Sequence, residues 1–145
     1  MNYYVYLNTK KLNKNEELAV KEYTKRLSAY CKTAWYCHPA KDCISIISKI
    51  KYSEHTLFLQ VQADEASPSS EELANDFNQM AIQGISTVYI FIGYPHGTET
   101  SEPAIKSMKT LFLSSMTLST GLTSVVFYEQ LYRCYRILNN QPYHK

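Results

Sequence analysis

The sequence predicts a single α/β domain whose sheet is mostly parallel and carries helices on both faces. Segments with strand-like apolar runs alternate along the chain with segments of helical periodicity, which is the pattern of an α/β protein. Two central runs, at 56–61 and 87–92, are apolar almost throughout, as in strands covered on both sides. No repeat or low-complexity tract divides the 145 residues, of which 45% are apolar and 19% charged. Residues 1–145 are therefore predicted to be one domain.

The first half of the chain predicts three strands and two helices. Residues 2–7 alternate as a strand does, and a short strand is expected over 34–39, ending at a proline. Residues 15–30 predict an amphipathic helix, and 42–52 a second one, before the apolar strand at 56–61. The inward stripes of the two helices are Ala19, Tyr23, Leu27 and Tyr30, then Cys43, Ile46, Ile47 and Ile50.

The second half opens with the best-marked helix. Ser69 and Glu72 fit a capping box at its start, and Gly84 supplies a left-handed stop. A buried strand follows over 87–92. Three further elements complete the prediction: a helix over 101–113, a short strand over 114–118, and a long helix over 122–138.

Charge and composition favour a protein of the cytoplasm with no membrane span and no metal. No apolar run approaches the roughly 18 residues that a span needs, and no signal-peptide pattern opens the chain. The four cysteines lack metal-ligand spacing, so ordinary thiols are expected. Residues 1–52 hold ten Lys/Arg against four Asp/Glu, giving +6. That excess suits a polyanionic partner, and it is equally typical of a solvated, lysine-rich helix face.

Three loops leave the carboxyl ends of predicted strands, where parallel sheets bind ligands. They are 62–68, 93–99 and the hydroxyl-rich segment 113–121. Neither a dinucleotide fingerprint nor a P-loop occurs. The last helix interleaves tyrosines with Arg133 and Arg136, a pattern that suits RNA but is more typical of a helix packed on a partner subunit.

Several segments resemble one known family. The strongest is "EQLYRCYRILNNQPYHK" at 129–145, supported by "KEYTKRLSAY", "SSEELA", "AIQG" and "LSSMTL". Together they are similar to the bacterial large-subunit rRNA pseudouridine N3-methyltransferases of the SPOUT superfamily. The resemblance runs from end to end of the chain.

This resemblance implies much that composition cannot. It implies a C-terminal trefoil knot, a homodimer, and S-adenosyl-L-methionine (SAM) as cofactor. It implies an enzyme that methylates N3 of a pseudouridine in 23S rRNA, with the ribosome as partner and the rRNA site shared between subunits.

The resemblance also implies the site residues. The catalytic ones would be Tyr143, His144 and Lys145, lying over the transferred methyl group. The cofactor contacts, mostly through main-chain amides, would be Val61, Gly93, Tyr94, Leu113, Ser114, Ser115, Met116, Thr117 and Leu118.

The chain departs from the family pattern at its loops. A glycine of the family is Tyr94 here, where a ring would crowd the cofactor, and a Pro-His pair is Ser119-Thr120. A family arginine is replaced by Ser124. These departures give an alternative hypothesis: a non-catalytic or retargeted relative that binds RNA or the ribosome.

Overall fold

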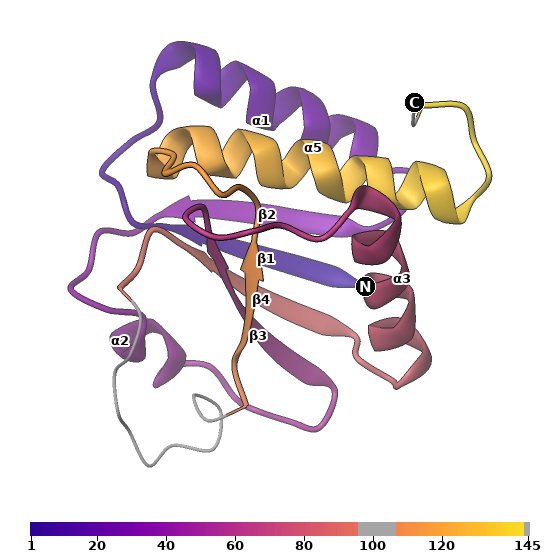
Figure 1. Ribbon diagram of the computed structural model, residues 1–145. Helices are drawn as coiled ribbons and strands as arrows, with labels where there is room; N and C mark the ends of the chain where they lie inside the picture. The colour runs from indigo at the N-terminus through magenta and orange to yellow at the C-terminus, as the bar shows by residue number, and fades with distance from the viewer. Residues whose placement is uncertain (96–106, 144–145) are drawn as a thin grey trace.

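The computed structural model describes residues 1–95 and 107–143, and its centre is a five-stranded sheet (Figure 1). Every pair of neighbouring strands is parallel, in the order β2-β1-β4-β3-β5. The strands are β1 (Asn2–Leu7), β2 (Lys32–Cys37), β3 (Thr56–Gln62), β4 (Thr87–Ile92) and β5 (Lys109–Phe112). The predicted α/β class and parallel sheet are confirmed.

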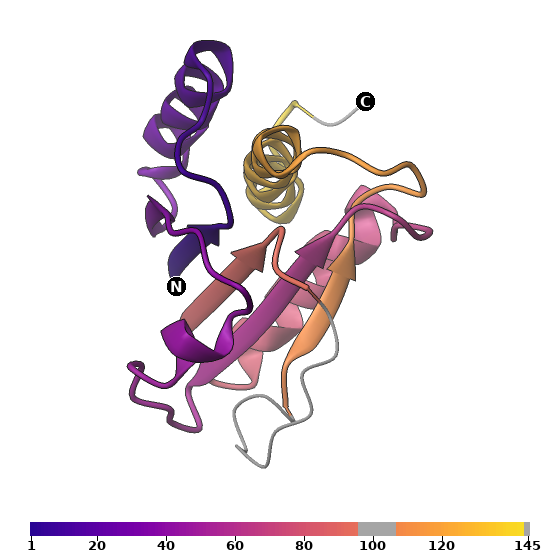
Figure 2. The ribbon, with the colours of Figure 1, turned by 90° about the vertical axis from the view of Figure 1, so that its left-hand side faces the viewer.

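The helices cover the two faces of the sheet unequally. The three long helices, α1 (Lys14–Leu27), α3 (Ser70–Ile82) and α5 (Thr120–Leu138), pack on one face. The single turn α2 (Ile44–Ile47) packs on the other. Figures 1 and 2 show α1 and α5 running side by side above the sheet, with α2 below it. Within residues 1–95 and 107–143, three long helices thus cover one face and the single turn α2 covers part of the other.

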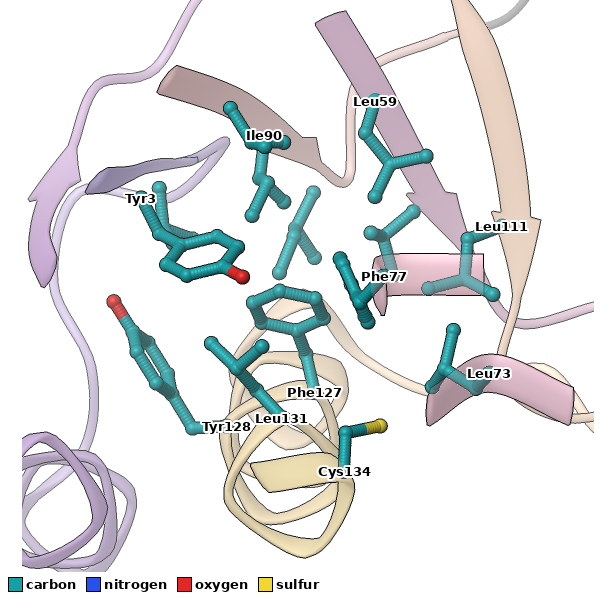
Figure 3. Close-up of a cluster of buried hydrophobic side chains, with 14 of the residues drawn as sticks. Tyr3, Leu59, Leu73, Phe77, Ile90, Leu111, Phe127, Tyr128, Leu131 and Cys134 are labelled. Carbon is teal, nitrogen blue, oxygen red and sulfur yellow. The ribbon is translucent and has the colours of Figure 1, made fainter. Parts of the chain in front are cut away.

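The main core lies between the sheet and α5 (Figure 3). Side chains at odd positions of β1 point to it, and Phe127 and Leu131 of α5 meet them with no exposed surface. The Tyr3 ring packs edge-on to Phe77 at 5.9 Å between centroids. Burying one such side chain stabilises the fold by roughly 1.5–3 kcal/mol, so this contact helps to fix α3 against β1.

Two helices begin with reciprocal caps. At α3, the Ser69 hydroxyl accepts the Glu72 N–H at 3.1 Å and the Glu72 carboxylate accepts the Ser69 N–H at 2.8 Å, as predicted. Asn13 and Glu16 form the same box at α1. Gly84 ends the α3 segment with φ +92°, which confirms the predicted left-handed stop.

The segment before α5 was predicted wrongly. Residues 109–112, expected within a helix, form the edge strand β5, and residues 114–118, expected as a strand, form a loop. The first part of the helix predicted over 101–113, residues 101–106, lies outside the described residues. A short apolar run is compatible with a helix and with a strand. Pairing of Leu111 with Val61 of β3 makes this one a strand.

Two further expectations need correction. The helix predicted over 42–52 is only the four residues of α2, although Cys43, Ile46 and Ile47 are buried as expected. The tyrosines of α5, expected to face a partner subunit, contact their own chain. Tyr128 is fully buried, and the Tyr135 ring stacks on Tyr30 at 5.4 Å.

Candidate active site

A cleft of about 390 Å³ opens where β3 and β4 end beside the start of α5. Its floor is the carboxyl edge of the sheet, because Val61 and Ile92 are partners in the parallel ladder. A volume of this size is within the range of small-molecule sites. The lining residues are Val61, Gln62, Ala63, Asp64, Gly93, Tyr94, Pro95, Leu118, Thr120 and Thr123.

Gly93 determines how closely the β4 loop approaches α5. Its φ is +85°, a conformation that side-chain-bearing residues rarely adopt. A Cβ at this position would lie 2.2 Å from the Thr120 hydroxyl oxygen, closer than any real contact. The Asn8 side-chain amide donates to the Gly93 carbonyl at 3.0 Å and holds the turn. The cleft therefore has bare main chain on this side.

Tyr94 presents its backbone to the cleft and its ring to the second core. The ring meets Phe91 edge-on at 5.9 Å, and the side chain is 2% exposed. Its hydroxyl donates to the His38 carbonyl at 2.6 Å. The side-chain amide of Gln60 donates to the Tyr94 carbonyl at 2.7 Å. The ring that was expected to crowd a cofactor is thus anchored elsewhere.

The structure brings together only some of the predicted cofactor residues. Val61, Gly93, Tyr94 and Leu118 line the cleft. The others, Leu113, Ser114, Ser115, Met116 and Thr117, belong to the loop before α5 and are not among its lining residues. The Leu113 N–H donates to the Gln62 carbonyl at 2.8 Å, so this loop starts beside the cleft.

Sequence reasoning missed two hydroxyl residues of the cleft, Thr120 and Thr123. Both lie in the first turn of α5, and Thr123 is 3% exposed with its hydroxyl donating to the Ser119 carbonyl at 2.7 Å. The available signal was the hydroxyl-rich segment 113–121, which continues into the helix. Their contact with the β4 loop is non-local and has no signature in the sequence.

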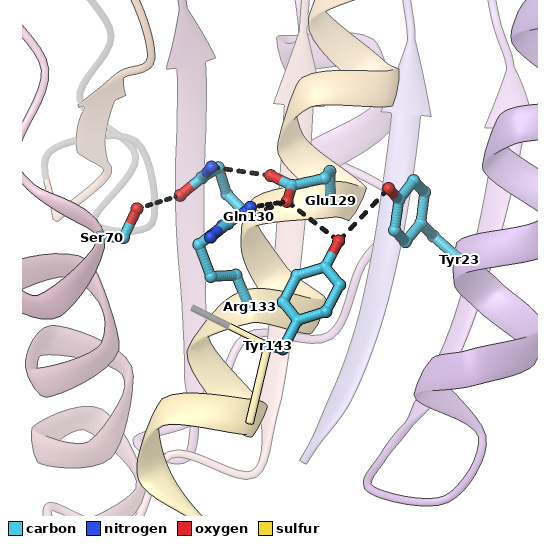
Figure 4. A network of polar contacts seen from close by, with 6 residues as sticks. All are labelled: Tyr23, Ser70, Glu129, Gln130, Arg133 and Tyr143. Carbon is cyan, nitrogen blue, oxygen red and sulfur yellow. Dashed lines mark hydrogen bonds and ion pairs between the residues drawn. The ribbon is translucent and has the colours of Figure 1, made fainter. Parts of the chain in front are cut away.

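The tail returns along α5 and docks through Tyr143 (Figure 4). The Tyr143 hydroxyl donates to the Glu129 carboxylate at 3.1 Å and lies 3.4 Å from the Tyr23 hydroxyl of α1. Its ring meets Tyr132 edge-on at 4.9 Å, with the Arg133 guanidinium 4.9 Å from the ring centroid. Tyr143 is half-buried, so the tail is held on the protein as far as this residue.

Glu129 is the centre of this polar network. The Arg133 guanidinium donates to one Glu129 oxygen at 2.6 Å, and the Gln130 amide donates to the other at 2.7 Å. The Ser70 hydroxyl of α3 donates to the Gln130 side chain at 2.6 Å, which ties three helices together. Burial is the largest cause that raises the pKa of Tyr143, so its phenol stays protonated as a donor.

Tyr143 does not line the cleft of its own chain. Glu129 is six residues beyond Thr123 on α5, a separation of roughly 9 Å along the helix axis. The remaining two predicted catalytic residues, His144 and Lys145, lie outside the described residues.

Burial raises the pKa of the Cys31 thiol to about 11 and that of Cys134 to about 12, so both remain thiols at neutral pH. Among residues 1–95 and 107–143 there is no group of three or more His, Cys, Asp or Glu residues placed to hold a metal ion. The same part of the chain has no helix both long and apolar enough to cross a membrane.

The fold and cleft define the chain as an α/β protein with a cleft at the carboxyl edge of its parallel sheet, the place where such sheets bind ligands. Comparison with known proteins specifies the family. A family model described as a predicted SPOUT methyltransferase matches residues 1–144. The chain belongs to the SPOUT methyltransferase family, which confirms the resemblance and makes it a methyltransferase by family.

Curated relatives agree along the whole chain. Ribosomal RNA large subunit methyltransferase H 1 of Thermoanaerobacter sp. (strain X514) is 33% identical over 145 residues, covering 100% of both chains. Ribosomal RNA large subunit methyltransferase H of Bacillus thuringiensis (strain Al Hakam) is 34% identical over 143 residues, covering 87% of this chain and 88% of the relative. That of Finegoldia magna is 32% identical, covering 89% and 90%.

Proposed function

We propose that this protein is a SAM-dependent methyltransferase that acts on N3 of a pseudouridine in 23S large-subunit rRNA. The observation that carries the proposal is the main-chain cleft at Gly93 and Thr120, in a chain of the SPOUT family. The full-length relatives named for large-subunit rRNA supply the substrate class. With the ribosome as substrate, we also propose that the enzyme works in the cytoplasm.

The cleft fits the cofactor on its own geometry. The absence of a Cβ at Gly93 lets the Thr120 side chain pack against the β4 loop, and Val61, Gln62 and Leu118 line the cleft beside it. Such a site can hold amino-acid and nucleoside groups by amides and carbonyls. The cofactor, when bound, supplies an electrophilic methyl group on a sulfonium.

The protein's own residues position the nucleophile and help to remove the N3 proton. A nucleophile held in line near the methyl carbon reacts without the entropic cost of a bimolecular encounter. The N3 imide of pseudouridine loses its proton as it attacks, and a cation beside its carbonyl oxygens favours the anion. We assign these roles to His144 and Lys145. Tyr143, which directly precedes these two residues, is anchored by its hydrogen bond to Glu129.

We also propose the family's homodimer and trefoil knot. Leu18 and Leu122 are exposed by 57% and 45%, beside the place where α1 and α5 start. There the Gly121 backbone lies against the Glu16 carboxylate, since a Cβ would come within 2.3 Å of it. Association through this apolar patch would bring a second chain to the carboxyl edge. The tail of one protomer then serves a site shared with its partner, which accounts for the position of Tyr143 away from its own cleft.

A non-catalytic relative was the alternative prediction, and it rested chiefly on Tyr94. The ring of Tyr94 is turned into the second core, so the departure leaves the cleft open. The family and its relatives support the catalytic function.

Transfer of tritium from methyl-labelled SAM to intact ribosomes tests the proposal. The label is expected in 23S rRNA, and digestion to nucleosides followed by mass spectrometry should identify it as 3-methylpseudouridine. Isolated 30S subunits serve as the control and should stay unlabelled. Absence of label from every ribosomal fraction at millimolar cofactor would reject the function.

A further inference from the structure

The second face of the sheet carries an unusual set of aromatic side chains. Even-numbered residues of β1 and odd-numbered residues of β4 point to it, and the cluster that includes α2 buries the rings of Phe58, Phe91 and Tyr94. Four tyrosines on this face remain partly or well exposed. They are Tyr4, Tyr6, Tyr36 and Tyr89.

Five neighbouring rings form one row across this face, with three contacts stacked and the one between Tyr36 and Tyr6 tilted by 31°. Tyr36 lies 5.2 Å from Tyr6, and Tyr6 lies 5.5 Å from Phe91 with 14° between the ring planes. The row continues from Phe91 to Phe58 at 6.2 Å and from Phe58 to Tyr52 at 6.0 Å. Its two ends, Tyr36 and Tyr52, are 43% and 45% exposed. Tyr36 belongs to the edge strand β2, so no further strand covers its outer side.

The surroundings of this row are cationic. Lys32 shares the face with Tyr36 by strand alternation, and Lys49 and Lys51 adjoin Tyr52 in sequence. All three are exposed, and within the described residues none of them forms an ion pair. The nearby acids are engaged: Asp42 accepts the Ile44 N–H at 3.0 Å, and Glu54 lies 3.5 Å from the His55 ring.

We propose that this face is a second RNA-binding surface, on which unpaired bases of the rRNA substrate extend the stacked row at Tyr36 and Tyr52. The inference rests on the proposed function, since it says how the same substrate is held away from the cleft. Base-to-aromatic stacking tolerates any base, and the lysines neutralise the phosphates that run alongside.

Charge favours RNA over a second copy of the chain. Self-association through this face would set its unpaired lysines against the same lysines of the partner. The phenols add no negative charge, because burial and the neighbouring tyrosines raise the pKa of Tyr6 and Tyr89. Their protonated hydroxyls remain donors to phosphate and base edges.

The test measures binding of a fluorescein-labelled single-stranded 12-mer oligouridylate by anisotropy at fixed salt. The variant combines Tyr36→Ala and Tyr52→Ala, and both side chains are exposed enough that folding is preserved. Affinity should fall about tenfold for each ring removed. Tyr36→Phe with Tyr52→Phe keeps both rings and should bind within about twofold of the wild type. Ile82→Ala, at a 69% exposed position on α3, is the control on the other face.

The outcomes separate this inference from the proposed function. In the ribosome assay, the double alanine variant should raise KM with kcat and SAM affinity unchanged. Equal oligouridylate affinity in the alanine variant and wild type would overturn the inference, even if methylation proceeds. Loss of self-association or of protein binding, with RNA affinity intact, would overturn it too. Ring-dependent RNA binding without any methylation would support the stacking surface and reject the methyltransferase.

Discussion

The cleft and the tail are built from different parts of the polypeptide. The cleft is lined by Val61, Gly93 and Leu118, where Gly93 has no side chain and the Tyr94 ring is turned away, and we expect its contacts to be mostly with main chain. The tail is held by side chains, through the contacts among Tyr143, Glu129 and Arg133. A backbone site tolerates changes of side chain but not an added Cβ. A network of side chains is disrupted when a substitution removes a single hydrogen-bonding or charged group.

The largest effect is expected from Gly93→Ala. The new methyl group would collide with Thr120 and force a left-handed conformation on alanine. SAM affinity, measured by calorimetry, should fall at least about 100-fold, or roughly 2.7 kcal/mol. Gly84→Ala is the matched control: its φ is also positive, at +92°, but the nearest atom to a Cβ is 3.7 Å away. It should lose about 1 kcal/mol of stability and keep its cofactor affinity.

Removal of His144 and Lys145 should separate transfer from binding. General acid and base groups contribute roughly 10²–10⁴ in rate, so kcat should drop by about that factor. The midpoint of thermal unfolding and the SAM dissociation constant should stay near wild-type values. Methylation at the full rate by the truncated protein would show that the tail is not catalytic.

Glu129→Gln tests whether the side-chain contacts of the tail act separately from the cleft. The amide keeps the size of the side chain but loses the charged partner of Arg133, a pair in which both side chains are about 20% exposed. We expect a loss of roughly 1–2 kcal/mol of unfolding free energy in urea titrations and a fall in kcat of about tenfold. The affinity for SAM should not change. A lower affinity would show that the cleft depends on the contacts of the tail.

The smallest effect is expected from Gln62→Ala. This residue lines the cleft, yet its main-chain carbonyl accepts the Leu113 N–H and survives the substitution. SAM affinity should stay within about twofold of the wild type, because a surface truncation of this kind changes free energies by less than about 0.5 kcal/mol. A loss of tenfold or more would show that side chains, and not backbone, hold the cofactor.

Local signals predicted much of the fold. Four strands and the cap at Ser69 follow from periodicity and short-range chemistry, and their elements lie within two residues of the predicted strands, β2 beginning and ending two residues early. The carboxyl-edge rule also located the loops of the cleft. β5 was missed because the short apolar run "LFL" is compatible with a helix and with a strand. Only pairing with β3 makes it a strand.

The site was less predictable, for a physical reason. Gly93 against Thr120, and Tyr143 against Glu129, are contacts between distant residues, and neither pairing has a local signal. The direction of the Tyr94 ring depends on the space beside Phe91 and on the His38 carbonyl. The resemblance supplied the identity of the site segments, and the structure supplied which way each side chain faces.

Amide hydrogen exchange with and without saturating SAM tests the central claim most directly, because it reports on the backbone groups that form the cleft. Exchange should slow at 62–64, 93–94 and 118–123 on addition of the cofactor, while the end of α3 near Gln83 stays unchanged. Protection confined to other segments, or none at saturation, would contradict a cofactor site built from these amides.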